Sequence, residues 1–437
     1  MSGPQLPGPS SPDPVSRRRF MQASAVIAGA AAIGTLPAFG AAPARRASRL
    51  RIGVIGCGGR GTGAAQNALE ASPDTEIVAI GDVLKERVDS CRSSLTKLEG
   101  NLSERVRLSD ATCFTGWDAY RQVIDAGVDS VILATPPGFR PAHYAYAIEK
   151  RKHVFMEKPV AVDPVGVRKV IEASRAAEAH GLCVVAGTQR RHQACYLAAI
   201  ERIRRGDIGE VRSAQCYWMQ GGLWMHTRRP EWSDAEWQLR NWLYFTWLSG
   251  DHIVEQHVHN IDVVNWVLGN PVRVQSAMGG RQVRTDAAYG HVFDHFAIVF
   301  EYPNGAIVTS MCQQIDGCQS RVEECFQGTR GTAVTAPGRA QLTGDNAWRW
   351  TGDEPNPYMV EHKHLYEAIA SGTPLNEGVR IAESTLTAIM ARMSAYTGKP
   401  ITWEQAMSSE LDLTPPNLQW GDLATPPIPV PGKTKFV

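Results

Sequence analysis

Two side chains in this sequence, Lys158 and His259, have the chemistry and the setting of proton-transfer groups. Lys158 follows His153–Glu157, a short apolar segment that predicts a buried strand, and a lysine there can bond or protonate a substrate oxygen. His259 lies four residues after Glu255, and on a helix this spacing places a carboxylate one turn from an imidazole. Such a pair can orient the imidazole, stabilise its charged form and remove a hydroxyl proton while hydride leaves the same carbon. We therefore expect Lys158, His259 and Glu255 to be catalytic, and Lys158 and His259 also to bind substrate.

A glycine-rich turn joins a predicted strand, Ile52–Ile55, to a predicted helix, Gly61–Ser72. Its glycines have the G-x-G-x-x-G spacing that lets backbone approach a pyrophosphate at a helix N-terminus. With a nicotinamide dinucleotide held by this turn, Lys158 would stand beside the nicotinamide. The residues of the turn expected to contact the cofactor are Gly56, Gly58, Gly59, Arg60 and Gly61.

Asp82 ends the next predicted strand, Glu76–Asp82, where a carboxylate can hold the hydroxyl groups of the adenosine ribose. Its charge would repel the 2′-phosphate of NADP, so the sequence predicts NAD and makes NADP the weaker alternative. Later strand ends are expected near the nicotinamide. The cofactor contacts predicted there are Thr135, Pro136, Glu157 and Lys158.

From residue 50 onward, apolar strands alternate with helical patterns, which is typical of a parallel, doubly wound sheet. Residues 50–187 are therefore predicted to form a dinucleotide-binding Rossmann domain in an α/β protein. After the first two strands, its predicted elements are the helix Leu84–Glu99, the strand Val128–Thr135, the helix Pro141–Arg151, the strand His153–Glu157, the helix Pro164–His180 and the strand Cys183–Gly187.

Residues 188–410 have a different pattern and predict a second, α/β domain for substrate binding and oligomer contacts. The strand-like segments Val211–Trp218, Val272–Gly279, Phe293–Tyr302 and Ala306–Cys312, with a hairpin turn at Pro303-Asn304-Gly305, predict a mostly antiparallel sheet with helices on one side. Two late helices, Glu361–Ser371 and Ile381–Thr397, are expected to pack back on the first domain. Residues 411–437 are rich in proline and are expected to form an extended arm.

The segment that begins near Gly250 predicts one helix with a buried stripe of Val254, Val258, Ile261, Val264 and Leu268. On that helix Glu255, His259 and Asp262 would share a face, and Asp251 would join them if the helix starts early. Three histidines in this segment also suggest a metal. However, a helix directs His257 and His259 about 200° apart, so they cannot easily chelate one ion, and no metal is expected.

The order of these motifs resembles the Gfo/Idh/MocA family of sugar and polyol oxidoreductases over residues 51–408. The segments that carry the resemblance are the Gly56–Gly61 turn, Ala134-Thr135-Pro136, Glu157-Lys158-Pro159, Gly187–Arg191 and the helix near Gly250. The resemblance implies a Rossmann domain, a C-terminal domain with a large open sheet, and NAD(H) or NADP(H). Because the open sheet of the family often makes oligomer contacts, it also implies a homo-oligomer, either a dimer or a tetramer.

The resemblance also bears on individual side chains. In the family, the helix usually carries an Asp and then a His four residues later; here Glu255 takes the Asp place and His259 the His place. Gln189–His192 resembles the family's Asn-Arg-Arg-Phe segment, and Arg191 in it could bond substrate hydroxyls or form an inter-domain ion pair.

Six of the twelve tryptophans lie between residues 218 and 247. Exposed indoles such as Trp224 could stack on the C–H face of a sugar, so Trp224 is a candidate substrate contact. Alternatively, the tryptophans stabilise an insertion by burying one another. We weigh the two roles equally.

Residues 1–44 predict a twin-arginine export signal. Ser16-Arg17-Arg18-Arg19-Phe20-Met21 precedes the uncharged, Ala- and Gly-rich stretch Ala23–Ala42, and a small-residue cleavage pattern follows at Ala42-Pro43-Ala44. We therefore expect a periplasmic or otherwise exported protein with no stable membrane insertion. A net charge of +1 argues against nucleic acid as a partner.

Export constrains the expected reaction, because free nicotinamide cofactor is not expected outside the cytoplasm. The leading hypothesis is an enzyme that transfers hydride between a tightly bound nicotinamide cofactor and a sugar or polyol. A redox-neutral, NAD-dependent glycosidase or lyase, acting by transient oxidation and elimination, is an alternative that uses the same residues. A non-catalytic sugar- or dinucleotide-binding module is the third.

Overall fold

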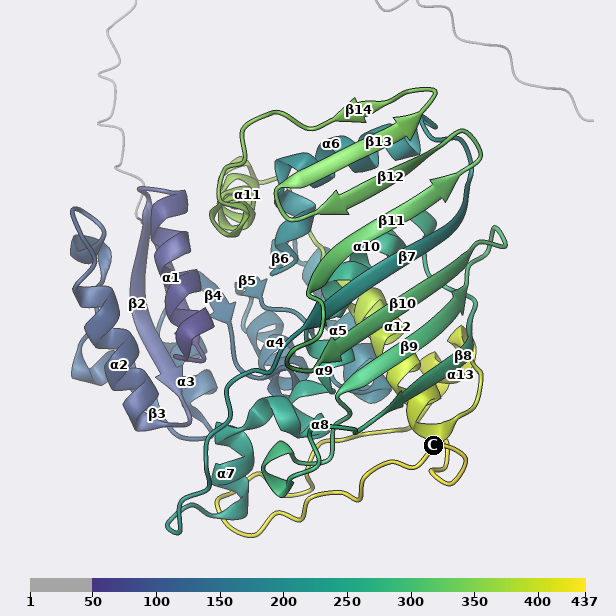
Figure 1. Ribbon diagram of the computed structural model, residues 1–437. Helices are drawn as coiled ribbons and strands as arrows, with labels where there is room; N and C mark the ends of the chain where they lie inside the picture. The colour runs from purple at the N-terminus through teal and green to yellow at the C-terminus, as the bar shows by residue number, and fades with distance from the viewer. Residues whose placement is uncertain (1–48) are drawn as a thin grey trace, which may run out of the picture. The chain divides into compact units, whose positions relative to one another are not determined.

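The computed structural model describes residues 49–437, so the predicted export signal lies outside the described residues. The first domain has a six-stranded, wholly parallel sheet in the order β3-β2-β1-β4-β5-β6 (Figure 1). This order confirms the predicted doubly wound Rossmann sheet. Its strands are β1 (Leu50–Ile55), β2 (Thr75–Asp82), β3 (Cys113–Thr115), β4 (Ser130–Leu133), β5 (His153–Met156) and β6 (Val184–Ala186).

Helices cover both faces of this sheet because alternate strand residues are apolar on each side. One hydrophobic cluster joins Ile52 and Val54 to α1, α2 and the late helix α11, and another joins Ile55 and Leu133 to α3, α4 and α5. The helices of this domain are α1 (Gly59–Ala71), α2 (Lys85–Thr96), α3 (Ala119–Asp125), α4 (Arg140–Glu149) and α5 (Pro164–Ala179).

The second sheet has nine strands in the order β14-β13-β12-β11-β7-β10-β9-β8-β15. Only the pairing of β7 with β10 is parallel, which confirms the predicted, mainly antiparallel sheet. Its strands are β7 (Val211–Gln220), β8 (Arg273–Gly280), β9 (His295–Glu301), β10 (Ile307–Gln314), β11 (Arg321–Gly328), β12 (Gly331–Ala336), β13 (Arg339–Gly344), β14 (Trp348–Arg349) and β15 (Ile401–Thr402).

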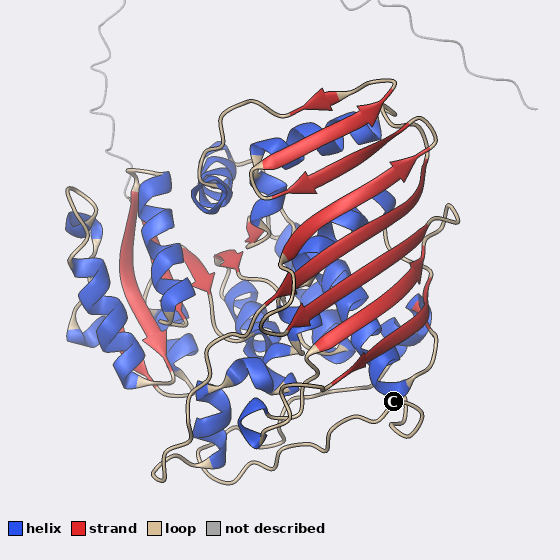
Figure 2. Ribbon diagram, viewed as in Figure 1, coloured by secondary structure: helices blue, strands red, loops and turns tan. Residues whose placement is uncertain are grey.

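Helices cover one face of the second sheet, and the other face is open (Figure 2). The packed face meets α6, α10 and α12, and strand residues alternate between buried and partly exposed positions, as in β9. On the open face, Met278, Ala297 and Met311 are paired across three adjacent strands. The helices of this domain are α6 (Ala194–Arg204), α7 (Asp234–Arg240), α8 (Thr246–Ser249), α9 (His252–Glu255), α10 (Val258–Leu268), α11 (Pro357–Ser371), α12 (Gly378–Thr397) and α13 (Trp403–Ser408).

The late helices lie against the first domain. Leu365 and Tyr366 of α11 share the hydrophobic cluster of α1, and α12 packs along α5. After α13 the chain has no helix or strand and runs past α7. There Trp420 packs against Trp117 of the first domain, with ring centroids 4.8 Å apart and the rings tilted by 48°. No helix among residues 49–437 has the length and apolar character needed to cross a bilayer.

Candidate active site

A cavity of about 670 Å³ lies at the carboxyl ends of the Rossmann strands, and both domains line it. It brings together most of the side chains and glycines that the sequence singles out. Those that line it are Gly56, Gly58, Gly59, Arg60, Asp82, Thr135, Pro136, Glu157, Lys158, Trp224, Glu255 and His259. Two predicted site residues, Gly61 and Arg191, lie elsewhere.

The glycine-rich turn leaves open backbone at the start of α1. Gly58 caps this helix without a side-chain bond, and no acidic residue occupies its first turn, so its N–H groups face the cavity unopposed. A Cβ built on Gly58 or Gly59 meets nothing within 4 Å. Gly56 has φ +96°, and a Cβ there would lie 2.5 Å from the Thr135 nitrogen. The turn therefore fits the pyrophosphate of a dinucleotide.

Gly61 serves packing instead. Gly61 is buried in α1, and a Cβ at this position would lie 1.8 Å from the carbonyl oxygen of Gly56. Gly61 does not line the cavity and instead allows a close approach of helix α1 to the preceding turn, so its position does not support the predicted cofactor contact.

Asp82 lines the cavity at the end of β2. Its carboxylate accepts hydrogen bonds from the Cys57 N–H (2.7 Å) and the Leu84 N–H (3.0 Å). Burial raises the pKa of Asp82, and the two backbone hydrogen bonds oppose that rise. Arg87 also lines this end of the cavity, a residue that sequence reasoning missed because it lies mid-pattern in a polar helix.

Lys158 is held by the second domain. Its Nζ donates to Oε1 of Glu255 at 2.8 Å and to the Glu255 carbonyl oxygen at 2.5 Å, and both side chains are about one-eighth exposed. The expected pairing of Glu255 with His259 is therefore wrong, because Glu255 instead pairs with Lys158. An ammonium group has three N–H donors, so one remains for a ligand in the cavity.

His259 lies beside the cavity with its ring stacked on Trp218, at 5.7 Å between centroids and 19° between planes. Burial, and then the positive charges of Lys158 and Arg190, hold the pKa of His259 well below its usual range. The imidazole is therefore neutral at neutral pH and can accept a proton. The expectation that a carboxylate stabilises its charged form is corrected.

The expected single helix after Gly250 is interrupted, and this explains the change of partners. The chain forms α9 and α10 with Gln256 and His257 at the break, where His257 Nε2 lies 2.7 Å from the Ser310 hydroxyl. Asp251 and Asp262 consequently point away from the cavity. Asp251 accepts hydrogen bonds from the Phe293 N–H (2.9 Å) and the Tyr396 hydroxyl (2.6 Å).

Arg191 forms an ion pair, but not the inter-domain pair that was its alternative role, because its partner Asp262 also lies in the second domain. Its guanidinium donates to Asp262 at 2.7 and 2.9 Å, and Arg380 approaches the same carboxylate at 3.2 Å. The side chain of Arg191 is 10% exposed, and Arg191 does not line the cavity. The substrate role predicted for Arg191 is therefore not supported by its position.

A second ion-pair group lies behind the glycine-rich turn. Arg60 pairs with Glu157, the residue before Lys158, and its NH2 group lies 3.6 Å from the buried carboxyl of Glu361. Burial, together with the nearby negative charge of Glu157, holds the pKa of Glu361 well above its usual range. Arg140 fixes the neighbouring strand end by donating to the carbonyl oxygens of Leu133 and Thr135.

The tryptophans take both of their expected settings. Trp237 and Trp247 are buried in one hydrophobic cluster, which supports their structural role. Trp218 and Trp224 line the cavity. Trp224 is 43% exposed, and its ring neighbours are His226 and Trp242.

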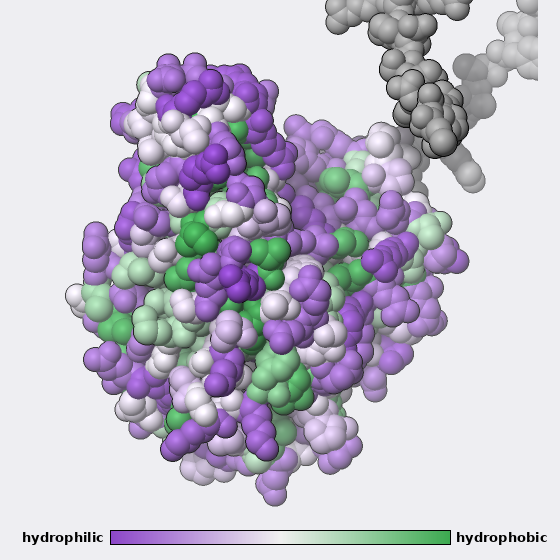
Figure 3. All heavy atoms as spheres, turned by 90° about the vertical axis from the view of Figure 1, so that its right-hand side faces the viewer, coloured by the Kyte–Doolittle hydropathy of each residue, from purple (hydrophilic) through white to green (hydrophobic). Residues whose placement is uncertain are grey.

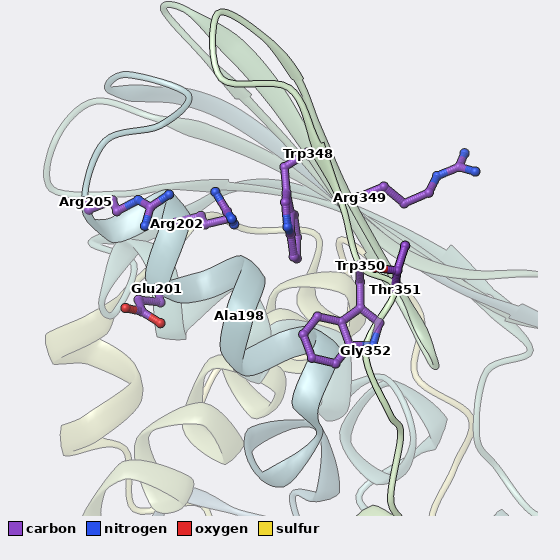
Figure 4. A pocket seen from close by; sticks show the side chains of 9 residues that line it. All are labelled: Ala198, Glu201, Arg202, Arg205, Trp348, Arg349, Trp350, Thr351 and Gly352. Atoms are coloured by element: carbon purple, nitrogen blue, oxygen red, sulfur yellow. The ribbon is translucent and has the colours of Figure 1, made fainter.

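No group of three or more His, Cys, Asp or Glu side chains within residues 49–437 is arranged to hold a metal ion. A second hollow of about 260 Å³ lies between α6 and the chain around β14 (Figure 4). Its Arg202 and Arg205 are already paired with Asp207, and Arg202 stacks on Trp348 at 4.5 Å. This hollow shares no lining residue with the first cavity.

Fold and cavity together define the class of protein: a two-domain, dinucleotide-dependent oxidoreductase. A family model described as "Oxidoreductase family, NAD-binding Rossmann fold" matches residues 50–188, and the C-terminal domain model of GFO/IDH/MocA proteins matches residues 196–334. The chain belongs to the Gfo/Idh/MocA family.

The similar proteins carry names of different enzymes, among them a dehydrogenase and a hydratase. An inositol 2-dehydrogenase of Acidothermus cellulolyticus is 25% identical over 332 residues, which cover 76% of this chain and 84% of that protein. A 2,7-anhydro-N-acetylneuraminate hydratase of Escherichia coli is 28% identical over 182 residues, 42% of this chain and 45% of that protein. Among solved structures, an oxidoreductase from Thermotoga maritima has a TM-score of 0.63 at 20% identity and covers 81% of this chain and 98% of its own.

Proposed function

We propose that this protein oxidises a hydroxyl group of a sugar or polyol with NAD⁺, and reduces the corresponding ketone in the reverse direction. The observation that carries the proposal is that Lys158, held by Glu255, and a neutral His259 line the same cavity as the open glycine-rich turn. A named inositol dehydrogenase among the relatives supports a cyclic polyol or sugar as the substrate class.

The side chains divide the work of such a reaction. The bound nicotinamide would accept the hydride of the carbinol carbon. The one unused N–H of Lys158 donates a hydrogen bond to the reacting oxygen, and Glu255 keeps the ammonium group in place. His259 takes the hydroxyl proton, because its neutral ring is a free base at neutral pH. Trp218 holds the plane of the imidazole by stacking on it.

A redox-neutral elimination is the second candidate. It would use the same lysine and histidine to oxidise a sugar hydroxyl transiently, and the similarity to a hydratase supports it. The two reactions are separated by their products. Oxidation releases stoichiometric NADH, whereas the redox-neutral reaction releases an eliminated or hydrated product with no net NADH.

The test uses purified protein with NAD⁺ and a panel of inositols, pyranoses and glycosides. We expect Lys158→Met and His259→Asn to lower kcat/KM by about 10²- to 10⁴-fold, the range of a general acid or base. Lys152→Met is the matched control, since Lys152 donates to the Val128 carbonyl oxygen and does not line the cavity. Turnover of the Lys158 or His259 variant within threefold of wild type would contradict the proposal. Sugar binding without any turnover would favour a binding module.

We further propose that the protein is exported through the twin-arginine route with its dinucleotide bound. The proposal rests on the Arg17–Arg19 cluster and the stretch Ala23–Ala42. Fractionation of cells that express the full chain and an Arg17→Lys/Arg18→Lys/Arg19→Lys variant tests it. Equal export of the two proteins would contradict it.

We also propose a homo-oligomer formed through the open sheet. Met278 is 73% exposed and Met311 37% exposed on that sheet, in one row with Ala297. Elsewhere, on the side shown in Figure 3, hydrophobic residues occur in small groups between hydrophilic ones. Light scattering should give a dimer or tetramer mass, and a monomer at micromolar concentration would refute the proposal.

A further inference from the structure

The end of the cavity beside Asp82 is built from both domains. The first domain contributes Leu84 and Arg87, which follow β2. The second contributes Leu239, Arg240 and Trp242. These last residues belong to residues 223–244, named here the clasp, which include α7 and lie beyond the carboxyl end of β2 (Figure 1).

An ion pair joins the clasp to the first domain. Arg240 NH2 lies 2.6 Å from Oε1 of Glu86, in the first turn of α2. Arg240 itself is fixed within the clasp by Glu236 at 2.8 Å and by stacking over Trp232 at 4.7 Å. Glu86 and Arg240 therefore connect the two walls of the cavity.

Apolar contacts reinforce this connection. Leu84 is 9% exposed and belongs to the same hydrophobic cluster as Trp237 and Leu239 of α7. Val83, next to Asp82, packs against that cluster. The ribose-binding strand end and the clasp thus share one apolar core.

The clasp is also braced from within and from outside. Asn241 and His226 exchange hydrogen bonds of 2.8 and 2.9 Å, and the Tyr244 hydroxyl donates to the Trp224 carbonyl at 2.8 Å. On the outer side, the Ala235 N–H donates to the Gly421 carbonyl at 3.1 Å, and the Gln238 side chain donates to the Leu423 carbonyl at 2.7 Å. These bonds hold the clasp in one position over the cavity.

The order of groups in a dinucleotide indicates which part of it would occupy the end of the cavity beside the clasp. With the pyrophosphate at Gly58 and Gly59 and the ribose at Asp82, the adenine must extend past Asp82, away from Lys158. Leu84, Leu239 and Trp242 offer apolar surface to a planar base there.

We propose that the clasp encloses the adenosine of the bound dinucleotide and that the Glu86–Arg240 ion pair slows its release. This inference deepens the proposed function and rests on it, since it assumes that NAD occupies the cavity. It assigns a task to second-domain residues that do not touch the reacting atoms. Arg240 and Glu86 are positioning residues, and Trp242 is a cofactor contact.

The test measures release of 1,N6-etheno-NAD⁺, whose fluorescence reports the surroundings of its base, from the loaded full-length protein after mixing with excess NAD⁺. We expect Glu86→Gln and Arg240→Gln each to speed release by about two- to fivefold, as for a partly exposed ion pair, and the double variant to add little to either. Trp242→Ala should speed release by about tenfold or more. Arg229→Gln is the control, because Arg229 lies in the clasp but does not line the cavity.

A second measurement separates this inference from the function itself. Titration with ADP-ribose, which lacks nicotinamide, should show weaker binding in the Trp242 variant than in wild type. Release rates and ADP-ribose affinities within 1.5-fold of wild type in all four variants would contradict the role of the clasp and leave the proposed function standing. Failure of the wild-type protein to bind either nucleotide would overturn both. Melting temperatures of all variants establish that they are folded.

Discussion

Substituting one glycine of the turn should strongly weaken cofactor binding and leave the fold intact. Gly58 has φ −72° and ψ −175°, which any residue can adopt. A Cβ at this position meets no protein atom within 4 Å, because it points into the cavity. Gly58→Ala should therefore change the free energy of unfolding by less than about 1 kcal/mol.

The loss of affinity follows from what the methyl group displaces. It would occupy the space where a phosphate approaches the N–H groups of α1, and each hydrogen bond to a charged acceptor contributes about 1.5–3 kcal/mol. Weakening one or two of these bonds corresponds to about 2–4 kcal/mol, or about 30- to 1,000-fold in the dissociation constant.

Gly61 provides the contrast. A Cβ there would lie 1.8 Å from the Gly56 carbonyl oxygen, a backbone atom that cannot move aside cheaply. Gly61→Ala should lower the free energy of unfolding by about 2 kcal/mol or more and weaken binding as a consequence.

Calorimetric titration with NAD⁺ and guanidinium unfolding measure both quantities for the two variants. We expect a stable Gly58 variant that binds NAD⁺ weakly and a destabilised Gly61 variant. A dissociation constant for Gly58→Ala within threefold of wild type would refute the placement of the pyrophosphate at this turn.

Three further outcomes are expected. Glu324→Gln should lower the free energy of unfolding by about 3–5 kcal/mol in denaturant titrations. The fully buried carboxylate of Glu324 pairs with the buried Arg190 at 2.6 Å, and its loss leaves the charge of Arg190 uncompensated. A loss below about 1 kcal/mol would contradict this. Burial lowers the pKa of His143 and His257 to about 3 and that of His291 to about 4, so below pH 6.5 the unfolded chain binds more protons than the fold. Each histidine should then cost about 1.4 kcal/mol of stability per pH unit as the pH falls from about 6.5 toward these values, and equal unfolding free energies at pH 7 and 5 would exclude this account. Asp82→Asn should improve the affinity for NADP⁺ relative to NAD⁺ about tenfold in parallel titrations, since it removes the charge that repels the 2′-phosphate. An unchanged ratio of the two affinities would show that the carboxylate does not face the ribose.

Local sequence patterns predicted most of the first domain, although β3 and α3 were missed. The strand before Gly56, the helix after it and Asp82 are encoded by residues close together in the chain, and the structure has each within a few residues of its predicted place. The late helices were predictable for the same reason, because their apolar periodicity is long. The strands between residues 321 and 349 were missed, since segments such as Arg321–Gly328 mix charged and apolar residues without clear alternation.

The partners within the site were not predictable from spacing. Glu255 and His259 are separated by one helical turn only if the helix is continuous, and the chain breaks it between α9 and α10, where His257 contacts Ser310 of β10. Arg191 likewise had two equally plausible roles, and spacing alone could not show that it pairs with Asp262, which lies in the same domain but 71 residues further along the chain. Contacts between residues far apart in the chain decided each of these cases.

The bond between Lys158 and Glu255 has a consequence for how a nucleotide reaches the cavity. This bond crosses between the domains, and α11 and α12 of the second domain pack on the first. Opening the two domains about a hinge would break the Lys158–Glu255 bond and expose these helices.

Entry by local unfolding of the clasp avoids that cost. If the clasp opens with a free energy of about 3 kcal/mol, the entrance is open for less than about one per cent of the time. The catalytic geometry then persists through every exchange of nucleotide. The rate of nucleotide exchange would then depend on the clasp, and the chemical step on the residues around Lys158. Amide hydrogen exchange should show early deuteration in residues 223–244, while the amides around Lys158 and Glu255 stay protected.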